Sequence, residues 1–155
     1  MRTDVAIIGA GPAGLLLAHL LAQDGIESVV IEARTQQYVA ARIRAGILES
    51  SSVDLLRNAG LGAGIDAHGD QHRGIYLQWP AERHHLDFVN LTGRSVWVYG
   101  QTQVQADLTA ASETAGRPVL VDDGVHTVGR AAGLDDGVNT VGRHAIEGSR
   151  RPRAV

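Results

Sequence analysis

Three glycines in the spacing Gly-x-Gly-x-x-Gly follow a short apolar run near the start of the chain. The run occupies residues 5–8, and the glycines are Gly9, Gly11 and Gly14. In this spacing the first glycine permits a tight turn, the second lets backbone approach a pyrophosphate, and the third lets the next helix pack closely. The N-terminus of that helix offers N–H groups and the positive end of its dipole to phosphate oxygens. These residues therefore predict a site for the pyrophosphate of a dinucleotide.

An acidic residue completes this pattern. Glu32 closes a second apolar run, residues 28–31, and lies eighteen residues after Gly14. A carboxylate at this place can accept hydrogen bonds from the hydroxyls of a ribose. A lone glycine triplet carries little information. Strand, glycines, helix, strand and acid in this order favour a nucleotide site over a glycine-rich turn without a ligand.

Two strands and a connecting helix must position these residues. The apolar runs at 5–8 and 28–32 are typical of parallel strands that are covered on both faces. Between them leucines recur at helical spacing, and Gly25 is a stop signal for the helix. The chain therefore begins as a βαβ unit of a Rossmann-like α/β fold, with the right-handed crossover that such units favour.

The middle of the chain changes its periodicity twice. Residues 33–46 lack a period, the pattern over 47–58 predicts a helix, and the glycine-rich stretch 61–73 indicates a loop. Apolar residues then alternate with other residues over the segments 75–79, 86–88 and 96–98. Alternation with period two predicts three short antiparallel strands, which we interpret as an insertion in the nucleotide-binding fold.

The last third of the chain begins with a helix signal. Thr102 and Gln105 form a capping box for a helix that Gly116 would end, and residues 119–121 read as a strand. Residues 122–130 then recur almost intact at 135–143, and the end of the chain is basic without an apolar period. We expect residues 1–121 to form the N-terminal part of the nucleotide-binding domain and residues 122–155 to be a divergent, poorly ordered tail.

Composition and charge give no support to several classes of function, namely nucleic-acid binding, membrane association and metal binding. The 155 residues carry a net charge of −3 and no cysteine, which gives no reason to expect a nucleic acid or an anionic membrane as partner. The apolar stretch 5–22 contains Pro12 and three glycines, so it does not read as a signal peptide or membrane span, and we expect a cytoplasmic protein. His68 and His72 lack further ligands in a fitting pattern, so no metal site is predicted.

Several segments resemble a known family. Besides the glycine motif they are residues 38–39, 42–49, 53–57 and 98–102, of which the Arg-Ile-Arg-Ala-Gly and Val-Tyr-Gly-Gln-Thr runs are the most specific. The chain resembles the N-terminal part of the class A FAD-dependent aromatic hydroxylases, most of all those of the 4-hydroxybenzoate 3-monooxygenase type. The likeness covers about residues 1–121 and implies a Rossmann-like FAD-binding fold of the glutathione-reductase type, incomplete at its C-terminal side.

The resemblance assigns roles to individual residues. It implies that the backbone at Gly9, Gly11, Ala13 and Gly14 holds the FAD pyrophosphate and that Glu32 holds the adenosine ribose. It implies that the flavin site is lined by Arg42, Ile43, Arg44, Ala45, Gly46, Ile47 and Gln101, with Arg44 also helping to receive the nicotinamide cofactor. It places His72 where the family keeps a surface histidine that relays the substrate's phenolic proton to solvent.

The resemblance also implies a reaction. Members of the family use FAD, NADPH or NADH, and O2 to insert one oxygen atom ortho to the phenol of 4-hydroxybenzoate, and intact relatives are homodimers. The later Asp-Gly and Gly-Asp motifs and the substrate-binding tyrosines of the family have no counterpart here, so the sequence reads as a truncated or frameshifted monooxygenase. Ala33 replaces a frequent arginine, which leaves the choice between NADPH and NADH open.

Two other classes remain open. One is a non-catalytic fragment that binds FAD or another nucleotide. The other is an NAD(P)-binding reductase domain, because the glycine motif by itself does not separate FAD from NAD.

Overall fold

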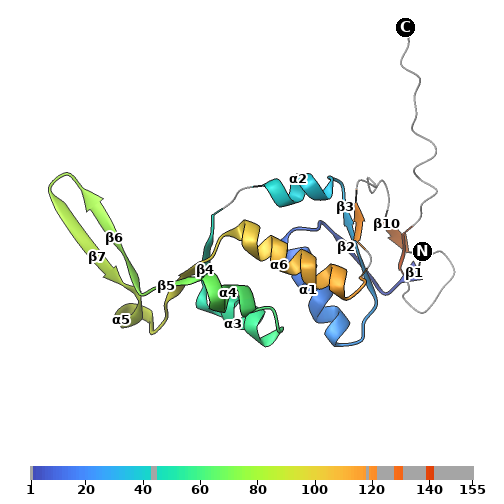
Figure 1. The fold of residues 1–155 in the computed structure, drawn as a ribbon, viewed down its shortest axis with the longest axis horizontal. Helices are drawn as coiled ribbons and strands as arrows, with labels where there is room; N and C mark the ends of the chain where they lie inside the picture. The colour runs from blue at the N-terminus through green and yellow to red at the C-terminus, as the bar shows by residue number, and fades with distance from the viewer. Residues whose placement is uncertain (1, 43–44, 118, 122–127, 131–138, 142–155) are drawn as a thin grey trace, which may run out of the picture. The chain divides into compact units, whose positions relative to one another are not determined.

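The computed structural model describes residues 2–42, 45–117, 119–121, 128–130 and 139–141 (Figure 1). The chain divides into two compact units. The first unit comprises residues 1–41 and 112–155, and the second unit comprises residues 42–111. The glycine motif and Glu32 belong to the first unit, whereas the arginine-containing segment, His72 and Gln101 belong to the second.

A parallel sheet forms the centre of the first unit. Strands β2 (Val5–Ile8), β3 (Ser28–Glu32) and β9 (Val119–Val121) lie in the order β2-β3-β9. Helix α1 (Pro12–Gln23) connects β2 to β3, and the two strands pair in parallel. The predicted βαβ start, the strand at 119–121 and the α/β fold class are therefore confirmed.

Burial within this sheet follows the strand order. The middle strand β3 carries Val29, Val30 and Ile31, which are at most 2% exposed. In β2 only Ile7 is buried, and Ile8 is 63% exposed. The expectation that β2 is covered on both faces is therefore wrong, because the side chain of Ile8 is uncovered at the end of the strand.

Short elements complete the first unit. Helix α2 (Gln36–Ala41) lies where the sequence indicated irregular chain. Strands β1 (Arg2–Thr3), β11 (Asn139–Val141) and β10 (Val128–Arg130) form a second sheet in that order. Val128 pairs with Val141, which holds the same position in the other copy of the repeat. The rest of the expected tail, residues 122–127, 131–138 and 142–155, lies outside the described residues.

The second unit begins with a sheet of three short strands. They are β4 (Ile47–Glu49), β8 (Val96–Val98) and β5 (Asp70–His72), in the order β4-β8-β5. Helices α3 (Ser50–Asn58) and α4 (Ala63–His68) lie between β4 and β5 in the chain. The predicted helix over 47–58 is therefore three residues too long, and the predicted loop over 61–73 contains a helix and a strand. Pairing with β8 explains the two strands, because it holds residues 47–49 and 70–72 extended.

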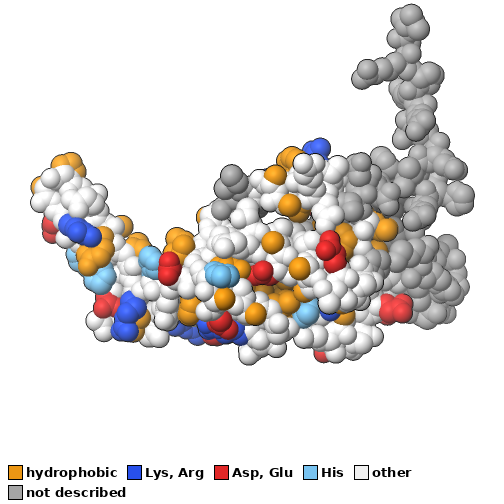
Figure 2. All heavy atoms as spheres, in the orientation of Figure 1, with side chains coloured by type: hydrophobic (Ala, Val, Ile, Leu, Met, Phe, Trp, Pro, Cys, Tyr) orange, Lys and Arg blue, Asp and Glu red, His pale blue; other side chains and the backbone are white. Residues whose placement is uncertain are grey.

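A hairpin of strands β6 (Gly74–Trp79) and β7 (Glu82–Asp87) follows (Figure 1). Only two of the three predicted antiparallel strands pair with each other, since β8 joins β4 and β5 instead. Phe88 begins helix α5 (Phe88–Thr92) rather than ending a strand, because the Asp87 side chain accepts a hydrogen bond from the Asn90 N–H and caps the helix. Figure 2 shows hydrophobic side chains together with arginine and histidine on the surface of the hairpin, in which Tyr76 is 58% exposed.

Helix α6 (Gln101–Thr114) is the longest helix of the described residues, and it runs from the second unit into the first. Its Val104 and Leu108 are buried, and Gly116, the predicted stop, follows it with a φ of +61°. The cap differs from the prediction: the Gln103 side chain accepts a hydrogen bond from the Gly100 N–H at 3.0 Å. Among the helices that the structure describes, none is both long and apolar enough to cross a membrane.

Candidate functional site

Gly9 and Gly14 meet at the turn between β2 and α1, and each needs to be glycine for a different reason. Gly9 adopts a φ of +105°, a conformation that residues with a side chain rarely adopt, and its N–H donates to the Ile31 carbonyl at 2.7 Å. A Cβ atom on Gly14 would overlap the carbonyl oxygen of Gly9. The turn therefore holds the start of α1 directly against the end of β2.

Neither a positive φ nor close packing against other protein atoms requires a glycine at position 11. Its φ is −72°, which any residue can adopt, and an ideal Cβ atom built on it has no protein atom within 4 Å. Gly11 is also the N-cap of α1, and no side chain caps the helix there. The turn therefore has an open side next to a helix N-terminus, and this arrangement fits a phosphate group that a Cβ atom would obstruct.

Glu32 lies against the same turn. One carboxylate oxygen accepts the Ala10 N–H at 2.9 Å, and the other accepts the Arg34 N–H at 2.9 Å. The side chain is half-buried at the end of β3. The structure thus brings the glycines, Ala13 and Glu32 together in one unit, as a dinucleotide site requires.

A second group of predicted residues lies in the second unit. Gly46 packs against the next segment of backbone, because a Cβ atom on it would lie 2.8 Å from the Gly100 Cα. Its carbonyl accepts the Tyr99 N–H at 2.7 Å, which extends the β4–β8 ladder by one residue. Gln101 is half-buried at the start of α6. The structure therefore brings the Gly46 end of the arginine-containing segment next to the residue that precedes Gln101.

Other predicted residues of this unit are exposed. Arg42 and Ala45 lie at the surface, and Ile47 is 63% exposed. His72 is exposed on β5 opposite Val96. Ile43 and Arg44 lie outside the described residues. Within the described ranges, no cluster of three histidine, cysteine or acidic side chains is arranged to hold a metal ion.

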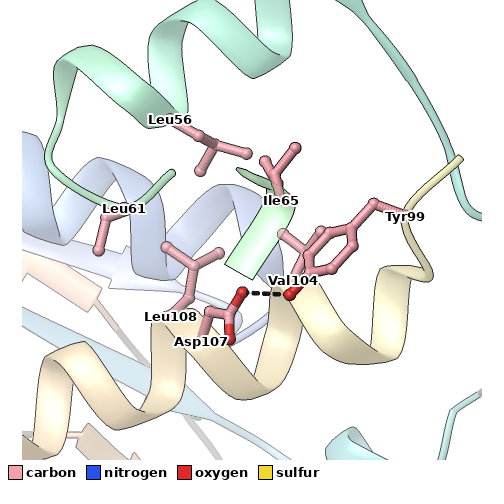
Figure 3. A pocket seen from close by; sticks show the side chains of 7 residues that line it. All are labelled: Leu56, Leu61, Ile65, Tyr99, Val104, Asp107 and Leu108. Carbon is pink, nitrogen blue, oxygen red and sulfur yellow. Dashed lines mark hydrogen bonds between the residues drawn. The ribbon is translucent and has the colours of Figure 1, made fainter. Parts of the chain in front are cut away.

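A polar pair in the second unit, formed by buried Tyr99 and half-buried Asp107, was missed by sequence reasoning. The Tyr99 hydroxyl donates to Asp107 at 2.7 Å, across a small pocket (Figure 3). The pocket is otherwise lined by aliphatic side chains: Leu56, Leu61, Ile65, Val104 and Leu108. The available signal was Asp107 itself, an acid three residues after Val104 and therefore close to the apolar face of α6.

The Tyr99–Asp107 pair is expected to make the folded protein less stable as the pH rises above about 10. Burial, with the hydrogen bond to Asp107 and its charge, raises the pKa of Tyr99 to about 12, from 10.0 in its ordinary state. Because the folded state has the higher pKa, its stabilisation is complete below about pH 10 and is lost as the pH rises toward about pH 12. We expect the free energy of unfolding to fall across this window by on the order of 2–3 kcal/mol.

Urea unfolding at a series of alkaline pH values measures this loss. The sequence contains neither lysine nor cysteine, so tyrosines are the side chains that titrate in this window. A Tyr99→Phe variant is the control, and its stability should vary less with pH than that of the parent chain. Equal pH profiles for the two proteins would contradict the assignment.

Comparison with known proteins gives one consistent result. The model of an FAD-binding domain family matches residues 2–150 of the chain. The p-hydroxybenzoate hydroxylase of Acinetobacter baylyi is 52% identical over 117 residues, which are 75% of this chain and 29% of that protein. The chain therefore spans under a third of the length of this relative.

Solved structures show the same fold. The Pseudomonas aeruginosa protein PqsL, solved with 2-aminobenzoylacetate, matches 84% of this chain and 36% of its own, with a TM-score of 0.74 and 20% identity. The p-nitrophenol 4-monooxygenase PnpA of Pseudomonas putida matches 82% of this chain and 33% of its own, with a TM-score of 0.70 and 19% identity. At these identities the likeness concerns the fold.

Proposed function

Since the chain belongs to the FAD-binding domain family of FAD-dependent aromatic monooxygenases, we propose that it is the FAD-binding part of a 4-hydroxybenzoate 3-monooxygenase. The reaction would be the NAD(P)H-driven ortho-hydroxylation of 4-hydroxybenzoate to 3,4-dihydroxybenzoate. The observation that carries the proposal is the open side of Gly11 at the uncapped N-terminus of α1, with Glu32 beside it. The 52% identity to a p-hydroxybenzoate hydroxylase supports the choice of substrate.

The residues of the first unit would bind the ADP half of the cofactor. Backbone N–H groups at Gly11, Ala13 and Gly14 face the place of the pyrophosphate, where the helix dipole adds to their attraction. Gly9 shapes the turn without a side chain in the way. Glu32 uses one lone pair of each oxygen for a backbone N–H, and the remaining lone pairs can accept ribose hydroxyls.

The residues of the second unit would serve the flavin half and the co-substrates. Gly46, Ile47 and Gln101 would line the flavin, with Ala45 and Ile43 as neighbours in the chain. The exposed Arg42 guanidinium and Arg44 suit the phosphates of NADPH or NADH. His72 is exposed, as a residue that passes a phenolic proton to solvent must be. Bound FAD, reduced by the nicotinamide cofactor, would supply the redox chemistry with O2.

FAD binding is the first test of this proposal. The purified chain should quench the fluorescence of added FAD in a saturable way, and Glu32→Gln should weaken the affinity about tenfold or more because a charged acceptor for the ribose is lost. Glu27→Gln is the matched control, since Glu27 is exposed on the same unit and should leave the affinity unchanged. Binding of NADH without any affinity for FAD would overturn the proposal in favour of a reductase domain.

A second candidate function is FAD binding without hydroxylation. It requires the glycine turn and Glu32 alone, which the structure brings together in one unit. Oxidation of NADPH or NADH by the FAD-loaded chain separates the two functions. Stimulation by 4-hydroxybenzoate supports the hydroxylase, and flavin binding without stimulation supports cofactor binding alone.

A further inference from the structure

Tyr99 contacts three segments of the second unit: its side chain contacts α4 and α6, and its backbone contacts Gly46. The residue is 3% exposed, and its hydroxyl donates to Asp107 on α6 at 2.7 Å. Gly64 of α4 lies directly behind this contact, because a Cβ atom on Gly64 would overlap both the Tyr99 hydroxyl and an Asp107 carboxylate oxygen. Figure 3 shows the tyrosine and the aspartate reaching toward each other from the two sides of the pocket. The hydroxyl is therefore held between Asp107 of α6 and Gly64 of α4.

The backbone of Tyr99 makes the other connection. Its N–H donates to the Gly46 carbonyl at 2.7 Å, directly after the pair Ile47 and Val98 in the β4–β8 ladder. Gly46 in turn has its Cα hydrogens against Gly100, with no space for a side chain between them. Gly46 is therefore held by the backbone of Tyr99 and Gly100, next to the ladder pair of Ile47 and Val98.

Tyr99 and Gly100 also lie directly before the start of α6. Gly100 donates its N–H to the Gln103 side chain at 3.0 Å, and Gln101 is the first residue of the helix. Asp107 lies two turns further along α6, so the Tyr99–Asp107 bond runs beside the first two turns. Tyr99 and Gly100 therefore connect Gly46 to the start of α6 at Gln101.

We propose that Tyr99 and Asp107 are positioning residues that hold Gly46 and Gln101 in place for the flavin half of FAD. The inference rests on the proposed FAD binding and deepens it. Neither side chain touches the cofactor in this role. Their hydrogen bond fixes the backbone from which the flavin-binding groups are presented, while the glycine turn of the other unit binds the ADP half independently.

Two ligands distinguish positioning from general stability. Tyr99→Phe keeps the ring and removes the hydrogen bond, and we expect about a tenfold loss of FAD affinity with unchanged ADP affinity. FAD is followed by flavin fluorescence and ADP by calorimetry, at a temperature where circular dichroism shows the variant folded. Asp107→Asn, made in the parent chain, keeps an acceptor for the Tyr99 hydroxyl and should therefore retain most of the FAD affinity. Tyr76→Phe is the control, because Tyr76 is exposed on the hairpin of the same unit.

The possible results separate the two proposals. Equal FAD affinity in Tyr99→Phe and in the parent chain would overturn the positioning role while leaving FAD binding intact. Parallel losses of FAD and ADP affinity would also overturn it, because they would show a general structural role. A parent chain that binds ADP and no FAD would overturn the proposed function itself, and the positioning role with it.

Discussion

Replacing Gly14 by alanine is expected to destabilise the first unit by about 3 kcal/mol, at the upper end of the usual range for overpacking. The added Cβ atom would overlap the Gly9 carbonyl oxygen, which belongs to backbone and cannot rotate away as a side-chain end could. Gly9 itself is fixed by its positive φ and by the hydrogen bond from its N–H to Ile31. Helix α1 must therefore move off the sheet, and the contacts of Leu15 and Ala18 with the core weaken.

Urea denaturation followed by circular dichroism measures this loss. Gly11→Ala is the matched control, since it adds the same methyl group three residues earlier, at a negative φ and into open space. Its cost should stay below about 1 kcal/mol, the range of N-cap exchanges. Similar losses in the two variants would show that the helix start tolerates a side chain at Gly14 and would contradict the close packing described here.

The same Gly11→Ala variant is expected to lose FAD affinity by about a hundredfold while remaining folded. The methyl group would occupy the open side of the turn and keep a pyrophosphate from the backbone N–H groups of α1. Charge-assisted hydrogen bonds to phosphate contribute roughly 1.5–3 kcal/mol each, so the loss of one or two accounts for this factor.

Titration of FAD against the folded variant measures the effect. ADP should lose affinity by a similar factor, because both ligands carry the pyrophosphate. This result would differ from the one expected for Tyr99→Phe, which spares ADP. Undiminished binding of FAD and ADP to Gly11→Ala would place the phosphates somewhere other than this turn.

The first unit was the part of the fold that the sequence predicted best. Its signals are local: the glycine spacing, the leucines of α1 and the apolar run of β3 lie within the first 32 residues. Gly25 and Gly116, both predicted as stops, adopt positive φ after their helices. The exposure of Ile8 was not predictable in the same way, because it depends on which distant segments pack on its face of the sheet.

The second unit was predicted less well, because its short strands depend on distant partners. β4 and β5 have three residues each and pair with β8, which lies 24 or more positions away from either strand in the chain. A periodicity of two cannot be recognised over three residues, and the residues before α3 therefore looked like its first turn. The hairpin was predicted because its strands are adjacent and longer.

The residues of the candidate site were also predicted better in the first unit than in the second. The sequence placed the glycines and Glu32 in one site, and the structure shows Glu32 bonded to the turn at Ala10. The roles given to Arg42, His72 and Gln101 came from the family resemblance and stay predictions. The Tyr99–Asp107 pair could not be predicted from the sequence. No sequence pattern links a tyrosine after a strand to an acid on the next helix, and only the fold brings the two side chains together.

The two hydrogen bonds of Glu32 have an energetic consequence for any ligand of the turn. Since Ala10 and Arg34 of the same unit donate to the carboxylate, the fold itself fixes the turn and the acid relative to each other. Ordering the turn and the acid costs conformational entropy. This cost is met during folding, so ligand binding does not include it. A nucleotide therefore meets a preorganised surface, and more of its contact energy appears as affinity.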